Sequence, residues 1–113
     1  MKDKEIISIN QMINYIDRAL KYTHEITFEE FESNQEKQDA TIFSISQIGE
    51  LVKNIDESTQ NEYSDIEWVI IKNLRNKIVH DYDGINLNII WDILKNDLIP
   101  LKEKLKKLMQ NYN

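Results

Sequence analysis

The sequence predicts an all-α protein: an up-and-down bundle of four to five helices in a single domain, residues 1–113. Three observations favour this fold class. Apolar residues recur at spacings of three and four along several stretches of the chain, as on one face of a helix. The chain has only two Gly and one Pro, too few for a turn-rich β-sandwich. Hydrophobic residues make up 41% of the sequence, enough for a single modest core.

The first two helices are expected at about residues 4–21 and 36–56. Their apolar stripes are Ile6, Ile9, Ile13, Ile16 and Leu20 in the first, and Ile42, Ile45, Ile48, Val52 and Ile55 in the second. Gly49 lies inside the second helix, where glycine costs ~1 kcal/mol relative to Ala, so we expect another helix to cross closely there. Between the two helices, Phe28 and Phe31 are expected to anchor a short turn or loop.

A third helix is expected after a loop at residues 57–65. Ser64 and Glu67 have the spacing of a capping box, which predicts a helix beginning at Asp65. This helix should end at Asp83-Gly84, with Gly84 in the left-handed conformation. Its predicted inner stripe is Ile66, Ile70, Leu74 and Ile78, while Trp68, Ile71, Arg75 and Tyr82 occupy a different side.

A fourth helix should begin near Asn86 or Asn88 and carry Ile90, Trp91, Leu94 and Leu98. Pro100 lacks a backbone N–H and disfavours helix at the preceding residue, so we expect a kink or break at Ile99. A basic helix follows, with Leu101, Leu105 and Leu108 facing inward. Short connections between these helices give the up-and-down arrangement.

Composition excludes several function classes. The chain has no Cys, so disulfides, thiolate catalysis and Cys-based zinc sites are excluded. The N-terminus shows no secretory signal pattern and no apolar run has the length of a membrane span, so we expect no membrane contact and a cytoplasmic location. The net charge of −6 argues mildly against nucleic-acid binding, although Lys72, Arg75 and Lys77 form a local cationic patch.

The segment "RNKIVHDY", residues 75–82, gathers Arg75, Asn76, His80 and Tyr82. On an ideal helix, Arg75 and His80 would lie roughly 140° apart around the axis and about 7.5 Å apart along it. One straight helix therefore does not assure a tight pair. A second copy of the chain can complete such a site across a two-fold axis, which favours a homodimer.

These residue types suit metal-free cleavage of RNA. A histidine can exchange protons near neutral pH, and an arginine offers donors that fit phosphate oxygens. Asn76, four residues before His80, lies on the same helical face and could orient the imidazole or the substrate. The bland alternative is that His80 caps carbonyls at a helix end. His24 is expected at the surface, and no motif indicates a metal site or a cofactor.

The segment "LRNKIVHDY" resembles the R-x4-H-x-Y signature of HepT toxins in the HEPN superfamily (higher eukaryotes and prokaryotes nucleotide-binding). "IGELVK" and "IIWDILKNDLIPLKEKL" are similar to other family segments, so the resemblance covers roughly residues 38–108. It implies a dimeric, all-α ribonuclease toxin paired with an MntA-type nucleotidyltransferase antitoxin. It also implies that Arg75 and His80 are the catalytic pair, that Asn76 accompanies them and that Tyr82 is adenylylated by the antitoxin.

Adenylylation would inhibit in a physically simple way, because AMP on Tyr82 would place a phosphate beside Arg75 and His80. Two other functions remain open. One is a non-catalytic, substrate-binding helical subunit of a two-chain nucleotidyltransferase; the intact R-x4-H-x-Y set argues against it. The other is an inert interaction bundle, which the acidic net charge favours.

Overall fold

The computed structural model describes residues 1–80 and 84–112, and of His80 it describes the main chain. Helices make up most of these residues, together with one pair of two-residue strands. In chain order the elements are α1 (Asp3–Tyr22), α2 (Phe28–Glu32), α3 (Gln35–Leu51), the 3₁₀ turn η1 (Val52–Asn54), α4 (Glu57–Glu62), α5 (Trp68–Lys72), α6 (Leu74–Ile78), β1 (Val79–His80), β2 (Gly84–Ile85), α7 (Leu87–Asp92), the π-helical segment η2 (Ile93–Asp97) and α8 (Leu98–Gln110). No helix in the described ranges is both long and apolar enough to cross a membrane.

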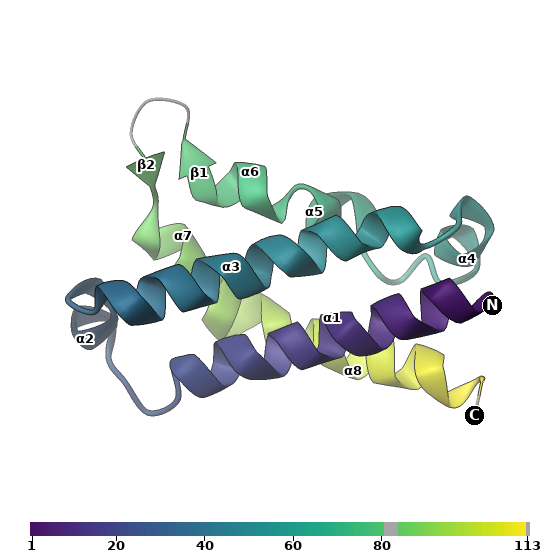
Figure 1. The fold of residues 1–113 in the computed structure, drawn as a ribbon, viewed down its shortest axis with the longest axis horizontal. Helices are drawn as coiled ribbons and strands as arrows, with labels where there is room; N and C mark the ends of the chain where they lie inside the picture. Colours follow the sequence, from purple (N-terminus) through teal and green to yellow (C-terminus); the bar gives the residue numbers. More distant parts are fainter. Residues whose placement is uncertain (81–83, 113) are drawn as a thin grey trace.

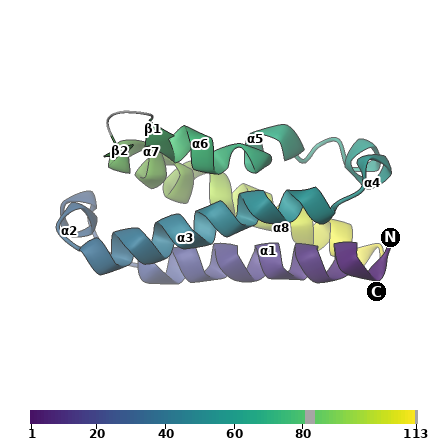
Figure 2. The same ribbon diagram turned by 45° about the horizontal axis from the view of Figure 1, so that its top comes forward.

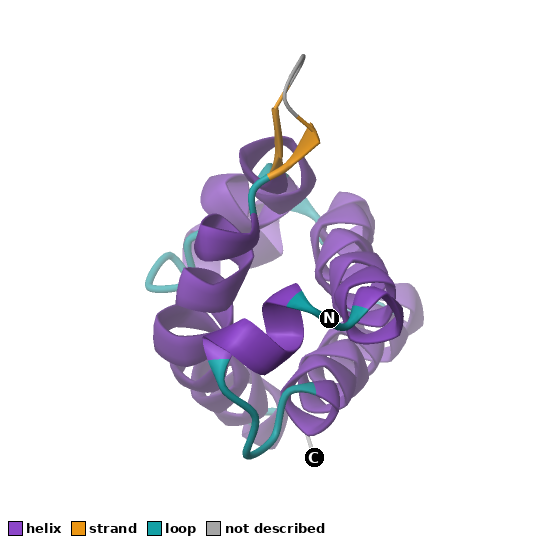
Figure 3. Cartoon of the chain, turned by 90° about the vertical axis from the view of Figure 1, so that its left-hand side faces the viewer, coloured by secondary structure: helices purple, strands orange, loops and turns teal. Residues whose placement is uncertain are grey.

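The long helical segments alternate in direction along the molecule. α3 runs antiparallel to α1, α5 and α6 return along α3, and the segment from α7 to α8 runs back beside α1 (Figure 1, Figure 2). Viewed end on, the helices surround a common centre (Figure 3). The predicted all-α, up-and-down bundle is therefore confirmed.

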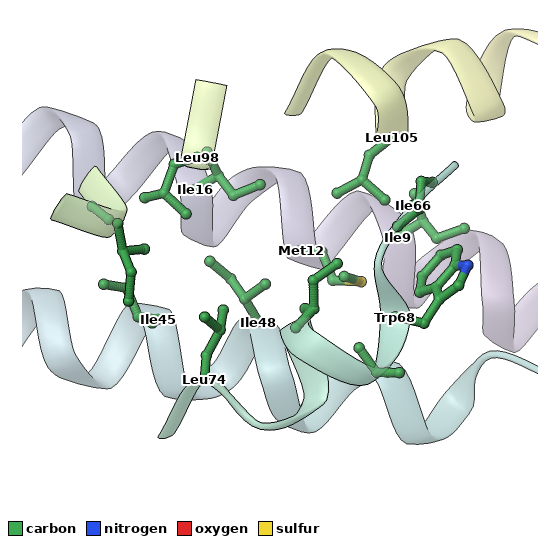
Figure 4. Close-up of a cluster of buried hydrophobic side chains, with 14 of the residues drawn as sticks. Ile9, Met12, Ile16, Ile45, Ile48, Ile66, Trp68, Leu74, Leu98 and Leu105 are labelled. Carbon is green, nitrogen blue, oxygen red and sulfur yellow. The ribbon is translucent and has the colours of Figure 1, made fainter. Parts of the chain in front are cut away.

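The core is mostly aliphatic, with Phe31 and Trp68 as its aromatic members, and takes side chains from every long segment (Figure 4). The stripes expected on the first two helices are confirmed, because Ile9, Ile16, Ile45 and Ile48 are fully buried. The other fully buried apolar side chains among the described residues are Met12, Ala19, Phe31, Ile78, Ile90, Ile93 and Leu105. This arrangement removes the apolar face of each helix from water, the main favourable contribution to folding.

Gly49 lies where α3 meets α5, as its cost within a helix led us to expect. A Cβ atom at this position would be 2.8 Å from the carbonyl oxygen of Ile71 and 3.3 Å from that of Lys72. Glycine therefore lets the two main chains touch directly. The close crossing fixes the position of α5 and of the segment that follows it.

Two segments expected as loops contain short helices. Thr27 and Glu30 form a reciprocal capping box that begins α2, in which Phe31 is buried and Phe28 half-buried. The two Phe anchors are confirmed, but the segment between them is helical. The second segment, expected as a loop at residues 57–65, contains α4. Buried Thr59 fixes α4 against the bundle, a tertiary contact with no signature in the local sequence.

The third helix differs from its prediction at its start. It begins at Trp68 rather than Asp65, and Ser64 makes no cap. A turn precedes it, in which the Trp68 main-chain N–H donates to the Ile66 carbonyl and the indole N–H to the Tyr63 carbonyl. Burial of Ile66 and Trp68 in the core stabilises this turn against the competing capping box.

The middle and end of the third helix also differ. It is interrupted at Asn73 and ends at Ile78, not at Asp83-Gly84. Trp68 and Ile71, which we assigned to another side, are buried, whereas Ile70 is 52% exposed. The close approach of the Ile71 and Lys72 main chain to Gly49 turns this face of the segment toward the core.

The predicted break at Ile99 is absent. Helical structure continues from Leu87 to Gln110, and the departure from α geometry lies earlier, in η2. There the Leu98 N–H donates to the Ile93 carbonyl, five residues back. This wider turn lies just before Pro100, whose ring would otherwise crowd the carbonyl of the preceding turn. The inward positions Leu105 and Leu108 are confirmed.

Candidate functional site

The segment that carries the candidate catalytic residues passes from a helix into a hairpin. After α6 ends at Ile78, Val79 pairs with Ile85 and His80 with Gly84 in an antiparallel ladder. The Asn86 N–H donates to the Ile78 carbonyl at 3.0 Å and closes the base of the hairpin. The hairpin projects from the bundle (Figure 1, Figure 3).

Gly84 has φ +77°, so its predicted left-handed conformation is confirmed, although it lies in a strand rather than at a helix end. The main chain of His80 belongs to β1 and not to the last turn of a helix. The separation expected for Arg75 and His80 on one ideal helix, roughly 140° around its axis, therefore does not apply. The helix ends at Ile78 and the next residues pair with Gly84 and Ile85, a long-range requirement that hydrophobic periodicity does not reveal.

Arg75 lies on α6 with its side chain exposed. In the part of the chain that the structure describes, its guanidinium makes no ion pair and no hydrogen bond. Asn76, the next residue, is also exposed. An unpaired guanidinium with five N–H donors at the surface is available to an anion such as a phosphate.

A shallow groove runs beside Arg75, between α3 and the hairpin. α3 lines it with Asp39, Ile42, Phe43, Ser46, Gln47 and Glu50. Arg75 of α6 and Ile85 of β2 line its other side. The groove thus combines a cation, apolar surface and several polar side chains.

The structure describes the predicted site residues to different extents. Arg75 and Asn76 are described completely, His80 only by its main chain, and Tyr82 lies outside the described residues. No distance between the Arg75 and His80 side chains follows from it. His24 is exposed, as predicted, with its Nε2 3.5 Å from a Glu25 carboxylate oxygen, in the connection between α1 and α2.

The cationic residues around Arg75 are also exposed. Lys72 and Lys77 form no ion pair within the described ranges. In contrast, two lysines of the C-terminal helix have internal partners: Lys102 pairs with Asp17 at 2.5 Å, and Lys104 donates to the Asp65 carbonyl. Within the described ranges, free positive charge is therefore found beside the hairpin and also at the exposed Lys106 and Lys107 of α8. No cluster of three or more His, Asp or Glu side chains that could hold a metal occurs among the described residues.

Sequence reasoning missed the contribution of α3 to this region. Phe43 is 55% exposed and Ser46 and Gln47 are half-buried, all on the side of α3 that faces Arg75. One signal was present: Phe43 lies outside the apolar stripe of its helix, so its ring had to face something other than the core.

Comparisons with known proteins agree with the motif. A family model described as "HepT-like: Ribonuclease HepT-like" matches residues 12–108. The chain is 39% identical over 93 residues to MJ0127, a candidate RNase of Methanocaldococcus jannaschii, covering 79% of this chain and 77% of that protein. It is 34% identical over 93 residues to "Probable ribonuclease HepT" of Thermococcus cleftensis, covering 82% and 84%.

A further similarity is to part of a longer protein. The chain is 31% identical over 107 residues to MJ0434 of Methanocaldococcus jannaschii, whose name joins a gamma-glutamylcyclotransferase to a candidate RNase. The match covers 95% of this chain but 48% of that protein. No solved structure gives a significant match.

Proposed function

Because the chain belongs to the HepT-like ribonuclease family, we propose that it is an endoribonuclease whose catalytic residues are Arg75 and His80. The observation that supports this most is the free guanidinium of Arg75, exposed on α6 just before the strand that contains His80. A structural arginine would be expected to have an internal partner. Its availability fits a role in binding a phosphate.

In the proposed mechanism the 2′-hydroxyl of the RNA attacks the adjacent phosphorus. The His80 imidazole exchanges protons with the reacting oxygens, which typically contributes about 10²–10⁴-fold to such steps. The Arg75 guanidinium stabilises the phosphate oxygens as their charge redistributes. Asn76 orients the imidazole or the substrate. The P–O5′ bond breaks, leaving a 2′,3′-cyclic phosphate and a free 5′-hydroxyl, and no metal is required.

RNA cleavage in the presence of EDTA tests this mechanism. We expect His80→Ala to abolish cleavage, Arg75→Ala to lower it about 10²–10³-fold, and Arg75→Lys to impair it because a point charge lacks the paired donors. The chain supplies matched controls, since His24 and Arg18 are its only other His and Arg. His24→Ala and Arg18→Ala should cleave like the wild type. Cleavage that stops with EDTA and returns with Mg²⁺ would contradict the metal-free mechanism.

We also propose that the active form is a homodimer in which the α5–α6 segments and hairpins of two copies face each other. Val79, 38% exposed, places apolar surface on the projecting hairpin, and Val69 and Ile70, 70% and 52% exposed, place apolar surface on α5. A two-stranded hairpin is marginal alone in water and is stabilised when it is covered. Light scattering at micromolar concentration should give twice the chain mass; a strict monomer would contradict this proposal.

The last part of the proposal is that the protein is the toxin of a toxin–antitoxin pair. Its antitoxin would be a minimal nucleotidyltransferase of the MntA type, which silences it by adenylylating Tyr82. Expression alone should arrest growth, and His80→Ala should abolish the arrest.

Intact-mass measurement after co-expression with the nucleotidyltransferase should show added AMP on the wild type but not on Tyr82→Phe. Tyr82→Phe keeps the ring and removes the acceptor hydroxyl, so it should remain toxic. Addition of AMP to Tyr82→Phe, or neutralisation of an unmodified wild type, would show that Tyr82 is not the switch.

A further inference from the structure

We propose that the groove between α3 and Arg75 is a nucleobase pocket, which holds one base of the RNA next to the phosphate bound by Arg75. Among the four bases it should prefer guanine. This inference rests on the proposed function and adds to it a substrate preference. The observations that support the inference are the side chains that α3 presents opposite Arg75.

Helical spacing sets these side chains in a row. Phe43 and Gln47 are four residues apart and Gln47 and Glu50 three apart, so they neighbour one another along one face of α3. α6 runs antiparallel to α3 (Figure 1). Arg75 of α6 lines the other side of the groove. A nucleotide whose phosphate contacts Arg75 would therefore place its base over this face.

Phe43 can serve as the stacking surface. Its ring is 55% exposed, and Tyr15 of α1 contacts it edge to face, with ring centroids 6.1 Å apart and an interplanar angle of 76°. Phe43 is thus supported on one side while much of its surface is open. Exposed aromatic rings beside a cation are the usual platform for bases of single-stranded RNA.

The polar lining can recognise the edge of the base. Ser46 and Gln47 make no side-chain hydrogen bond within the described part of the chain. Glu50 contacts Lys53 at 3.6 Å, an exposed pair that leaves carboxylate acceptor capacity free. Guanine presents two adjacent N–H donors that a carboxylate can accept, and a carbonyl oxygen that the Gln47 amide can donate to. Uracil presents a single N–H donor and cannot match this pattern.

Charge favours a base rather than a phosphate within the groove. Asp39 and Glu50 are carboxylates at the two ends of the row that α3 contributes, so they would repel the sugar–phosphate chain, which belongs on the side of Arg75. A second copy of the chain is a less suitable occupant. It would bury the Ser46 and Gln47 side chains, which costs free energy unless each gains a hydrogen-bond partner.

The test uses uridine hexanucleotides with or without one guanosine, on the full-length protein. Cleavage by the wild type gives KM and kcat, and fluorescence anisotropy with His80→Ala gives binding without turnover. We expect Phe43→Ala to raise KM and Kd about tenfold with little change in kcat, because stacking contributes mainly to binding. Phe43→Trp should retain both values. Gln47→Ala should reduce the preference for the guanosine hexamer.

Ile7→Ala is the matched control, because Ile7 is an equally exposed apolar residue on α1, 57% exposed. It should leave KM and Kd unchanged. Unchanged KM in Phe43→Ala would overturn the pocket. So would conversion of a dimer to a monomer by Phe43→Ala but not by Ile7→Ala, since a second copy would then cover the groove. If the wild type binds the guanosine hexamer through Phe43 but cleaves nothing, the pocket stands and the ribonuclease proposal fails.

Discussion

The two ends of the bundle use polar groups in opposite ways. At the end that holds the N-terminus, the carboxylate of Glu5 is 1% exposed and accepts hydrogen bonds from the main-chain N–H groups of Lys2 and Asp56, each at 3.0 Å. Thr59 adds a side-chain hydrogen bond. At the hairpin end, Arg75 is exposed and has no internal partner among the described residues.

The difference shows in the ionisation of Glu5. Burial raises the pKa of its carboxyl, but the hydrogen bonds from Thr59, Lys2 and Asp56 together lower it more, so the net shift is downward from 4.5. The carboxylate therefore stabilises the fold. The first end satisfies its polar groups internally, whereas the hairpin end leaves a charge and apolar surface for another molecule. Substitutions at the end that holds the N-terminus should therefore lower stability but not activity. Substitutions at the hairpin end should lower activity but not stability.

Among the substitutions that compare the two ends, Arg75→Ala should have the largest effect. It should lower activity without changing stability. We expect RNA cleavage to fall about 10²–10³-fold, the usual loss when a charge-stabilising donor is removed. Thermal unfolding should be nearly unchanged, because the guanidinium has no internal partner within the described residues. Lys77→Ala, an exposed cation two residues away, is the control and should keep activity within a few-fold. A large loss of stability in Arg75→Ala would show that the guanidinium has an internal role.

Gly49→Ala should disturb the packing of α3 against α5, on which both ends of the bundle depend. The added Cβ would meet the Ile71 carbonyl at 2.8 Å, and since the obstacle is main chain, α5 must move. We expect the free energy of unfolding to fall by about 3 kcal/mol, the upper part of the range for overpacking. Urea denaturation measures it, with Glu36→Ala on the exposed face of α3 as the control. Unchanged stability in Gly49→Ala would contradict the direct contact between α3 and α5.

Glu5→Gln should affect only stability. Loss of charge-assisted hydrogen bonds should reduce the free energy of unfolding by about 2 kcal/mol at pH 7. Because the folded pKa of Glu5 is lowered, the wild-type advantage is fully present above the unfolded pKa near 4.5 and is lost as the pH falls through the folded pKa. Denaturation from pH 7 to pH 3 checks this; a difference independent of pH would rule out the carboxylate as its source. Glu103→Gln, at an exposed position, is the control.

Asp17→Asn should have the smallest effect. Asp17 pairs with Lys102 and joins α1 to α8, but the two side chains are 49% and 30% exposed. Pairs of this kind contribute about 0.5 kcal/mol, and salt screens them. The melting temperature should therefore fall slightly at low ionic strength and by less in 1 M NaCl. A larger loss at high salt would contradict an electrostatic origin.

The parts of the fold that periodicity determines were predictable, and the parts that tertiary contacts determine were not. Ile9, Ile16, Ile45 and Ile48 recur with the spacing of a buried face, and all four are buried. The Ser64–Glu67 capping box has the right spacing, but burial of Trp68 and its neighbour overrides it. A local motif worth about 1 kcal/mol is outweighed by burial of a large aromatic side chain.

The candidate site was predictable only in part, for a related reason. Residue chemistry made Arg75 and Asn76 candidates, and both are exposed; their roles stay predictions. The hairpin was not predicted, because Val79 and His80 continue a helical pattern and only Gly84 signals the reversal. The groove was missed because Phe43 and Arg75 are 32 positions apart in sequence and meet only when α6 returns along α3.

The contact at Gly49 also limits how this protein can change. Ordinary core positions such as Ile45 and Ile48 pack through side chains, so another apolar residue of similar volume can replace them with some repacking. A contact between two main chains has no such alternative, since every other amino acid adds a Cβ. Position 49 therefore accepts only glycine without displacing a neighbouring main chain. The main chain that it contacts, at Ile71 and Lys72, lies about one helical turn before Arg75. If the proposed site is correct, variation that changes its specificity has to come from the exposed side chains of α3 and the hairpin rather than from the contact at Gly49.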